Sequence, residues 1–409
     1  MGDRPRVVVA GGSLGGLTAA LFLRDAGCDV TVHERSKVAL EGRGAGIVLH
    51  PASVRYLEKS RRVRVEEVST RADLLRYLRL DGSVLHEEPC RYRFTSYYTL
   101  HRGLLSCLEP ERYRPGSEVV GFQQDEKGVD VRLGDAILER SDLLVFADGI
   151  HSTGRALLLP NVRPEYAGYV GWRGTVSEES LDASAFDSLH EAITYYVGSN
   201  THILTYPIPD FDGSVEPGRR RINYVWYRNA AAGEEIDDIL TDRDGTRRAV
   251  SVGPGAVQER HVKALSEAAA EQLPKNMAYV VIHSEPFVQA VFDIEVARMA
   301  FGRVCLIGDA AFVIRPHAAA GTAKAAEDAY KLAEAITKSG RDVAQALREW
   351  EPAQLDMGRS VFERARDLGD RSQFHGTYRP PDPYLSFGLY QPGDSWMHES
   401  ASTGHAQPE

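Results

Sequence analysis

Two aspartates stand directly after short apolar runs, where a ligand-binding turn would place them. The run 303–307 predicts a buried strand that ends at Gly308-Asp309, and the run 142–147 predicts another that ends at Asp148-Gly149. In an open α/β sheet the carboxyl ends of strands border the ligand crevice, where a carboxylate can accept hydrogen bonds from sugar-alcohol hydroxyls. Both aspartates are therefore candidate ligand-binding residues, although a plain strand–turn–helix unit can carry such a residue too.

A third turn carries the glycine pattern of a dinucleotide site. The strand 7–10 runs into Gly11-Gly12-Ser13-Leu14-Gly15-Gly16, a helical pattern continues to Gly27, and a second strand closes at Glu34. Gly11 would form the tight turn, Gly16 would let the helix pack on the strand, and Glu34 would bind a ribose hydroxyl pair. Ser13 replaces the middle glycine, where the backbone would meet the pyrophosphate. Its side chain narrows that approach but offers a hydroxyl donor. Strand, helix and acid together predict a nucleotide site rather than a merely tight turn.

Two further segments are rich in small residues and could lie flat along a planar ligand. They are 43–51, which contains His50, and 316–321, which contains His317 and precedes a predicted helix from Gly321. A helix N-terminus favours negative charge. An unshifted imidazole titrates near neutrality, so each histidine is a candidate base, with a structural histidine as the alternative. Arg102, in a predicted helix, could reach a phosphate or lie on the surface.

Between residues 165 and 295 the sequence contains predicted strands that are rich in aromatic residues, which indicates a mostly antiparallel sheet. Aromatic strands usually form core, but these carry too many hydroxyl and indole donors for a core that must satisfy each one. We therefore expect some of these side chains to line a pocket. The candidates are Trp172, Tyr206, Tyr224 and Trp226.

The whole chain limits the classes of function. Its 409 residues, 43% hydrophobic and 26% charged, have ordinary globular composition. The net charge of −10 argues against a nucleic-acid or anionic-membrane surface. Four cysteines without C-x-x-C spacing suggest neither a disulfide framework nor a metal site, and no apolar run approaches a transmembrane length. A cytoplasmic protein is expected.

The three turns together, in this order and spacing, resemble those of the group A flavoprotein monooxygenases. The matching motifs are the N-terminal fingerprint, Ala147-Asp148-Gly149 with Ser152 and Arg155, and Gly308-Asp309 with Pro316 and Gly321. Segments 166–174, 206–209 and 315–321 look like the dihydroxypyridine hydroxylase branch of that family.

The resemblance implies an α/β fold with a discontinuous Rossmann-like FAD-binding domain, an inserted mostly antiparallel β-sheet substrate domain and C-terminal helices. The FAD-binding domain would comprise 1–75, 100–163 and 296–370; the substrate domain 76–99 and 164–295; and an irregular tail 371–409.

The resemblance also implies the activity. NADH or NADPH would reduce FAD, O2 would form a flavin C4a-hydroperoxide, and a small electron-rich aromatic or N-heteroaromatic ring, hydroxypyridine-like or phenol-like, would be hydroxylated. The catalytic base would be His50 or His317. The residues expected at the substrate are His50, Trp172, Tyr206, Tyr224, Trp226, Pro316 and His317. The residues expected at the cofactor are Gly11, Ser13, Leu14, Gly16, Glu34, Arg35, Arg43, Gly46, Arg102, Asp148, Gly308, Asp309, Ala319, Ala320, Gly321 and Thr322.

The sequence departs from the commonest family pattern at Ser13, at Phe312 and at 319–324, where G-Q-G-x-N is usual. Two rival classes stay open: an FAD-dependent reductase or dehydrogenase of the same fold, and a non-catalytic nucleotide sensor. The exact substrate, the choice of NADH or NADPH, and the oligomeric state, with a homodimer as one candidate, are not specified by the sequence.

Overall fold

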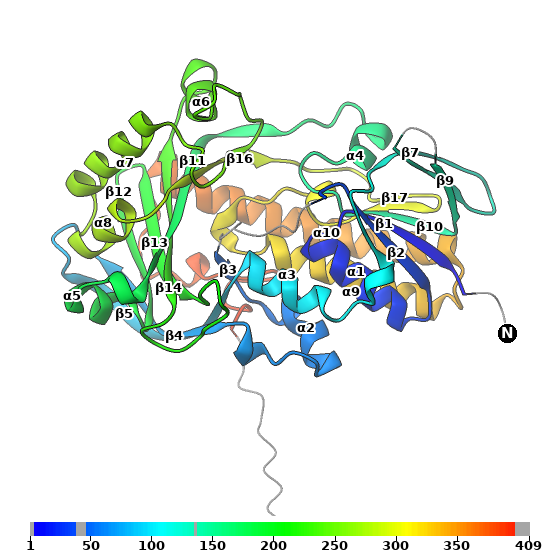
Figure 1. Ribbon diagram of the computed structural model, residues 1–409, viewed down its shortest axis with the longest axis horizontal. Coiled ribbons are helices and arrows are strands. Elements are labelled where there is room, and N and C mark those ends of the chain that lie inside the picture. Colours follow the sequence, from blue (N-terminus) through cyan, green and yellow to red (C-terminus); the bar gives the residue numbers. More distant parts are fainter. Residues whose placement is uncertain (1–3, 38–45, 135–136, 397–409) are drawn as a thin grey trace, which may run out of the picture.

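Residues 4–37, 46–134 and 137–396 are described by the computed structural model (Figure 1). They form three sheets: a six-stranded first sheet, a nine-stranded second sheet and a small three-stranded sheet. No helix within these ranges is long and apolar enough to cross a bilayer. The fold is the expected mixture of a mostly parallel sheet, a mostly antiparallel sheet and C-terminal helices.

The first sheet is assembled from distant parts of the chain in the order β17-β18-β10-β1-β2-β6. Its central strands are parallel, and only β17 runs antiparallel to its neighbour β18. The strands are β1 (Arg6–Ala10), β2 (Asp29–Glu34), β6 (Tyr113–Pro115), β10 (Leu143–Phe146), β17 (Ala300–Phe301) and β18 (Val304–Leu306). Parallel strands need both faces covered, which explains why the central strands β1, β10 and β18 are almost entirely apolar.

The two faces of the first sheet are covered differently. Helices α1 (Leu14–Asp25) and α9 (Gly321–Lys338) pack against each other and share one core with the sheet. The small sheet of β7 (Val119–Gln124), β8 (Val129–Leu133) and β9 (Ile137–Ser141) also joins this core, and the rings of Phe122 and Phe146 are in contact. The parallel arrangement brings the carboxyl ends of β1, β10 and β18 to one edge.

The second sheet has the order β15-β16-β11-β14-β13-β12-β4-β5-β3, and only its β12–β4 pairing is parallel. Its strands are β3 (Gly46–Val48), β4 (Thr70–Leu78), β5 (Val84–Ser96), β11 (Glu165–Ser177), β12 (Ala192–Gly198), β13 (Thr201–Ile208), β14 (Arg221–Asn229), β15 (Ser251–Val252) and β16 (Phe287–Asp293). Helices α5 (Ala183–Leu189), α7 (Glu259–Gln272) and α8 (Lys275–Ile282) cover its outer face (Figure 1). The inner face is turned toward the first sheet and the long C-terminal helix.

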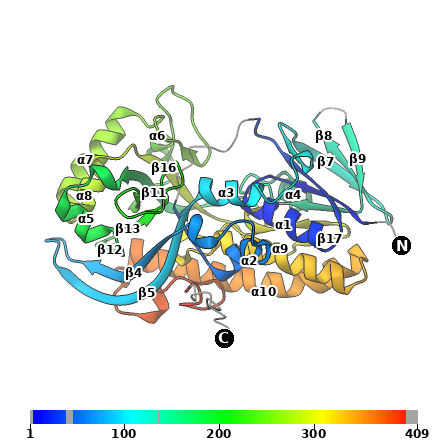
Figure 2. The same ribbon diagram turned by 60° about the horizontal axis from the view of Figure 1, so that its bottom comes forward.

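Helix α10 (Val343–Asp370) joins the two halves of the molecule. Figure 2 shows it extending from below the first sheet to below the second. Trp350 near its start lies in the core of the first sheet, and Met357, Val361 and Leu368 lie in the core against the second. The chain that follows docks on the second sheet through a group of buried side chains. These are Tyr378, Leu385, Phe387 and Leu389. The remaining helices are α2 (Pro51–Ser60), α3 (Tyr97–Leu105), α4 (Thr153–Leu158) and α6 (Glu234–Ile239).

Candidate functional site

A cavity of about 940 Å³ is lined by residues of both large sheets. One wall is made by the turns after β1, β2, β10 and β18 and by the start of α9; the other wall is the inner face of the second sheet. Ligand sites of doubly wound sheets lie at this position, outside the carboxyl ends of the strands. The volume is at the upper end of the range for small-molecule and cofactor sites.

The glycine turn after β1 is built as the fingerprint requires. Gly11 has φ +105°, and a Cβ there would lie 2.4 Å from the carbonyl oxygen of Ala147. A Cβ on Gly16 would lie 1.9 Å from the carbonyl oxygen of Gly11, so α1 can approach β1 only with glycine at this position. The Ser13 side chain does not cap the N-terminus of α1, and its hydroxyl hydrogen-bonds the Tyr97 hydroxyl at 2.8 Å instead. The backbone N–H groups of this helix start remain available to an anion.

Glu34 ends β2 on the cavity wall and is held by backbone amides. Its Oε2 accepts a hydrogen bond of 2.8 Å from Gly12 N, and its Oε1 accepts one of 2.8 Å from Ser36 N. The carboxylate is buried, but it lines the cavity. A carboxylate oxygen can accept more than one hydrogen bond, so ribose hydroxyls could still be bound here.

The two aspartate turns meet through one arginine. Arg155 on α4 donates to the backbone carbonyls of Asp309 at 3.2 Å and Ala310 at 3.0 Å, and also to the carbonyl of Ile150. Asp148 accepts the N–H of Thr153 at 2.7 Å through Oδ2, while its Oδ1 is buried without a partner in the described chain. Burial raises the pKa of the Asp148 carboxyl, and the hydrogen bonds from Ser152 and the α4 amides oppose this.

A buried ion pair supports the Asp309 turn from behind. Lys324 Nζ lies 2.6 Å from Asp328 Oδ2, both side chains are fully buried, and the same oxygen accepts Gly308 N at 2.9 Å. The Asp309 side chain itself opens into the cavity. Its position deep in the fold raises the pKa of its carboxyl, and the nearby Lys324 and Arg155 cations oppose that shift.

The start of α9 presents backbone to the cavity. Ala319 is left-handed at φ +53°, α9 begins at Gly321 without a side-chain cap, and Ala319, Ala320, Gly321 and Thr322 all line the cavity. His50 lies behind this turn, where its Nε2 bonds the Ala319 carbonyl at 2.9 Å. That bond requires Nε2 to carry the proton. Burial lowers the pKa of His50 to about 4.

The inner face of the second sheet is fixed by strand register. Tyr227 pairs with Gly171 on one side and His202 on the other, and the next row along the same face holds Arg173, Val225 and Leu204. These side chains line the cavity together with Tyr195 and Tyr206. The intervening residues therefore point to the outer face, because side chains alternate along a strand.

His317 is the imidazole that reaches this wall. Its ring lies 4.4 Å from the Tyr227 ring and 5.6 Å from the His202 ring, measured between centroids. Its Nε2 is 3.0 Å from the Tyr169 hydroxyl, and the Arg315 guanidinium lies over the Tyr169 ring at 5.7 Å from the ring centroid. Arg315 is fixed by Asp293 at 2.7 Å and Asp370 at 2.7 Å. Burial lowers the pKa of His317 well below its usual range, and His202 and Arg315 lower it further.

Most of the residues predicted from the sequence meet at this cavity. Gly16 packs behind it, and Arg43 lies outside the described residues. The predicted residues on the wall are Gly11, Ser13, Leu14, Glu34, Arg35, Gly46, Asp148, Tyr206, Gly308, Asp309, Pro316, His317, Ala319, Ala320, Gly321 and Thr322.

Five predicted residues lie elsewhere, which corrects the expectation for each. Trp172, Tyr224 and Trp226 point to the outer face, in the core beneath α7 and α8. There Tyr224 bonds Ser284 at 3.1 Å and Trp226 bonds Thr201 at 2.7 Å. His50 is separated from the cavity by Ala319. Arg102 is exposed and stacks on Tyr98 at 5.3 Å, because the opposite face of α3 carries His101 inward to the Gly12 carbonyl.

The wall residues that were absent from the predicted site include Arg173, Tyr195, His202 and Tyr227 on the inner face of the second sheet. The sequence did indicate a role for Arg173, because a lone arginine within an otherwise apolar and aromatic strand must face something other than the core. Given Arg173, the period of two along β11 and its partners would have selected Tyr227 over Trp226 and His202 over Ile203.

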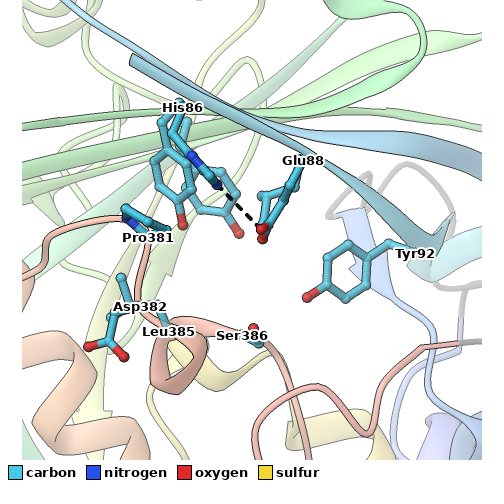
Figure 3. Close-up of a pocket in the computed structure, with 10 residues that line it drawn as sticks. His86, Glu88, Tyr92, Pro381, Asp382, Leu385 and Ser386 are labelled. Carbon is cyan, nitrogen blue, oxygen red and sulfur yellow. Dashed lines mark ion pairs between the residues drawn. The ribbon is translucent and has the colours of Figure 1, made fainter. Parts of the chain in front are cut away.

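A second, much smaller pocket lies under the C-terminal segment (Figure 3). Its volume is about 20 Å³, and Figure 3 shows His86, Glu88 and Tyr92 facing Pro381, Asp382 and Ser386. His86 Nε2 and Glu88 Oε2 are 3.3 Å apart. This space is sufficient for about one water molecule. It is too small for an aromatic substrate.

A dinucleotide fits the first wall on three observations. The glycine turn leaves room that a Cβ would fill, the N-terminus of α1 has amides free of side-chain caps, and Asp148 Oδ1 lacks a partner among the described residues. A flat ring system fits the space between the start of α9 and the inner face of the second sheet.

Comparisons with known proteins agree with this geometry. A family model described as FAD binding domain-like matches residues 166–293. The chain is 38% identical to a 2,6-dihydroxypyridine 3-monooxygenase of Paenarthrobacter nicotinovorans, over 94% of this chain and 96% of that protein. It is 30% identical to a 3-amino-4-hydroxybenzoate 2-monooxygenase of Streptomyces platensis, over 91% and 89%.

Solved structures of such enzymes also match this chain. The structure of 2,6-dihydroxypyridine-3-hydroxylase from Arthrobacter nicotinovorans matches with a TM-score of 0.90 and 37% identity, covering 96% of this chain and 98% of that one. Klebsiella pneumoniae HpxO, solved with FAD and uric acid, matches with a TM-score of 0.75 and 25% identity, covering 90% and 89%.

Proposed function

This chain belongs to the FAD-dependent aromatic-ring monooxygenases, and on that premise we propose that its substrate is a small hydroxylated pyridine or phenol bound against the inner face of the second sheet. The observation that carries the proposal is the wall formed by Tyr206, Tyr227 and His202 on the second sheet, which faces His317 and the uncapped start of α9. Planar rings stack on such aromatic side chains, and the imidazoles and hydroxyls can bind ring substituents.

The residues proposed to hold FAD are those of the first wall. Glu34 would bind the ribose, the start of α1 the pyrophosphate, Asp309 the ribityl or pyrophosphate region, and the start of α9 the edge of the flavin ring. When bound, FAD would supply the redox chemistry that takes electrons from NADH or NADPH and delivers oxygen from O2 to the ring.

The protein would orient the ring and exclude water. Ring carbons near the start of α9 would face the cofactor, since Pro316 and His317 precede that helix on the same wall. Enclosure by the second sheet, α9 and the docked segment at Phe387 would keep bulk solvent away.

For His317 we propose a hydrogen bond to a substrate oxygen. Burial raises the pKa of the Tyr169 phenol, so this hydroxyl keeps its hydrogen and can donate it to His317 Nε2 at 3.0 Å. The proton of the neutral ring then sits on Nδ1, which is buried without a partner in the described chain. His317 would act as a donor more than as a base, which revises the role expected from the sequence. His50 would position the Ala319 turn.

The division into an FAD-binding domain (1–75, 100–163 and 296–370), a substrate domain (76–99 and 164–295) and a C-terminal tail remains part of this proposal, as do a cytoplasmic location and a homodimer. The strand pairing adds that β3 and most of β4, which precede residue 76, belong to the second sheet.

The test is turnover of purified holoenzyme with 2,6-dihydroxypyridine, other hydroxypyridines and phenols. NADH and NADPH are supplied separately, O2 consumption is followed, and the product is analysed by mass spectrometry after reaction under ¹⁸O2. We expect ring-dependent coenzyme oxidation and incorporation of one ¹⁸O atom. Ring-dependent coenzyme oxidation without O2 consumption or labelled product would instead identify a reductase or dehydrogenase.

A further inference from the structure

We propose that Arg173 and His317 form a receptor for one oxyanion on the substrate ring, so that the enzyme binds a hydroxylated ring as its monoanion. The proposal rests on the proposed function, because it concerns the same cavity. It adds the charge state of the substrate and a residue that selects it.

Arg173 is a cation without an anion. Its side chain projects from β11 into the cavity, and within residues 4–37, 46–134 and 137–396 its guanidinium makes no hydrogen bond or ion pair. Arg248, the other arginine contributed by the second-sheet half of the chain, is matched by Asp242 at 2.7 Å. A partly buried guanidinium with five donors is costly to leave unpaired, so its position indicates a ligand that supplies negative charge.

The wall around Arg173 contains no carboxylate among its described residues. The acids that line the cavity, Glu34, Glu118, Asp148 and Asp309, all belong to the nucleotide side. The titratable neighbours of Arg173 are Tyr206 and Tyr227, and burial raises the pKa of both phenols while the Arg173 charge opposes the shift. Burial also lowers the pKa of His202 to about 3, so this imidazole is neutral as well. Arg173 therefore leaves this wall with an unbalanced charge of one.

His317 completes the receptor because it meets the same tyrosine. Tyr227 lies in the row next to Arg173 on the same face of the sheet, because it pairs with Gly171, and it is 4.4 Å from His317 between ring centroids. With Tyr169 donating to Nε2 at 3.0 Å, the His317 proton is on Nδ1, which has no partner among the described residues. A cation and a neutral donor around one aromatic wall suit an ionised ring hydroxyl, whose charge also raises electron density on the ring carbons.

The alternative source of negative charge is the pyrophosphate of NADH or NADPH. We favour the ring substrate because Arg173 shares its tyrosine neighbours with the wall that would hold the ring. The two sources separate experimentally, since only one of them is affected by removing ring hydroxyls.

The test is calorimetric titration of holoenzyme with two pairs of rings: 2,6-dihydroxypyridine against 2,6-dimethoxypyridine, and 4-nitrophenol against 4-nitroanisole. The variants are Arg173→Met, Arg173→Lys and, as a matched control, Arg228→Met. Arg228 lies on β14 of the same sheet but on its outer face, where it stacks on Trp226 at 4.7 Å. Flavin content and the circular dichroism spectrum are recorded for each variant.

We expect Arg173→Met to weaken binding of both hydroxylated rings by about 10- to 100-fold, the worth of one charge-assisted hydrogen bond, and to leave the methoxy rings unchanged. Arg173→Lys should recover part of the loss, and Arg228→Met should bind like wild type. Equal weakening of both members of each pair would overturn the receptor. The receptor would also be overturned if Arg173→Met bound the rings like wild type but needed more NADH or NADPH to saturate anaerobic flavin reduction. Anion-selective, Arg173-dependent binding without hydroxylation of any ring would instead overturn the proposed function and leave the receptor standing.

Discussion

The Nη1 atom of Arg155 donates a hydrogen bond of 3.2 Å to the backbone carbonyl of Asp309, although the two residues are 154 positions apart. Because Arg155 also donates to Ile150, one guanidinium fixes the turn after β10 against the turn after β18. The two aspartates that the sequence places at separate strand ends therefore act as one rigid edge of the cavity. Lys324 and Asp328 hold that edge from the α9 side.

Asp309→Ala should copurify with little FAD, because the variant loses the carboxylate that faces the cavity between Arg155 and Lys324. A charge-assisted hydrogen bond is worth about 1.5–3 kcal/mol, so FAD affinity should fall by at least about tenfold. The measurement is flavin per protein after dialysis, with Asp309→Asn as the variant that keeps a polar oxygen. Full flavin content in Asp309→Ala would show that the turn is only structural.

Glu34→Ala should lower FAD affinity by about tenfold or more, since the ribose would lose its carboxylate partner. It should also lower stability in the apoprotein, because the amides of Gly12 and Ser36 lose the oxygens that they bond at 2.8 Å. Fluorescence titration of apoprotein with FAD and thermal unfolding separate the two effects. An unchanged Kd for FAD would exclude Glu34 from the cofactor site.

Tyr227→Phe and Tyr224→Phe form a matched pair from one strand. Tyr227 lines the cavity, so its substitution should change KM for the ring by about 2- to 10-fold, the worth of a neutral hydrogen bond. Tyr224 bonds Ser284 on the outer face, so its substitution should cost about 1 kcal/mol of stability and leave KM unchanged. The measurements are steady-state kinetics and urea unfolding of both variants. If Tyr224 faced the cavity and Tyr227 the outer face, KM would change in Tyr224→Phe and stability would fall in Tyr227→Phe.

His317→Ala should slow ring hydroxylation by about 10²- to 10³-fold, the usual effect of losing one hydrogen-bond donor to a developing charge, while FAD is retained. Burial keeps the pKa of His317 well below 6.5, so the wild-type pH–rate profile should show no imidazole limb between pH 6 and 8. A limb near pH 6.5 that disappears in His317→Ala would identify it as a base of ordinary pKa. Rapid mixing of reduced enzyme with O2 and substrate provides the rates.

His50 should make stability depend on pH. Its pKa falls from 6.5 to about 4 on folding, so between these values the unfolded chain binds more protons than the folded chain. The stabilisation is complete above pH 6.5 and is lost as pH falls toward 4. His50→Gln should therefore reduce the loss in unfolding free energy between pH 7 and pH 5 by about 2 kcal/mol. Urea midpoints with saturating FAD give the difference, and equal losses in both proteins would contradict a buried neutral His50.

The sequence by itself determined the features that depend on neighbouring residues. Gly11 and Gly16 are required wherever a strand turns into a helix this tightly, Glu34 follows at the length of one βαβ unit, and Asp148 and Asp309 end apolar runs. Hydrophobic and aromatic periodicity also predicted a second, mostly antiparallel sheet, and the chain has one.

Only the tertiary structure decided which face each side chain occupies. Trp226 and Tyr227 are adjacent and equally aromatic, but α7 and α8 cover the outer face of the second sheet, so Trp226 enters the core and Tyr227 the cavity. His50 and His317 come from similar small-residue segments and are both buried. His50 lies behind the left-handed turn at Ala319 and bonds its carbonyl, whereas His317 lines the cavity. The sequence pattern divides the residues of a strand into two sets that point to opposite faces. The packing of distant helices decides which of the two faces is covered and which one meets the ligand.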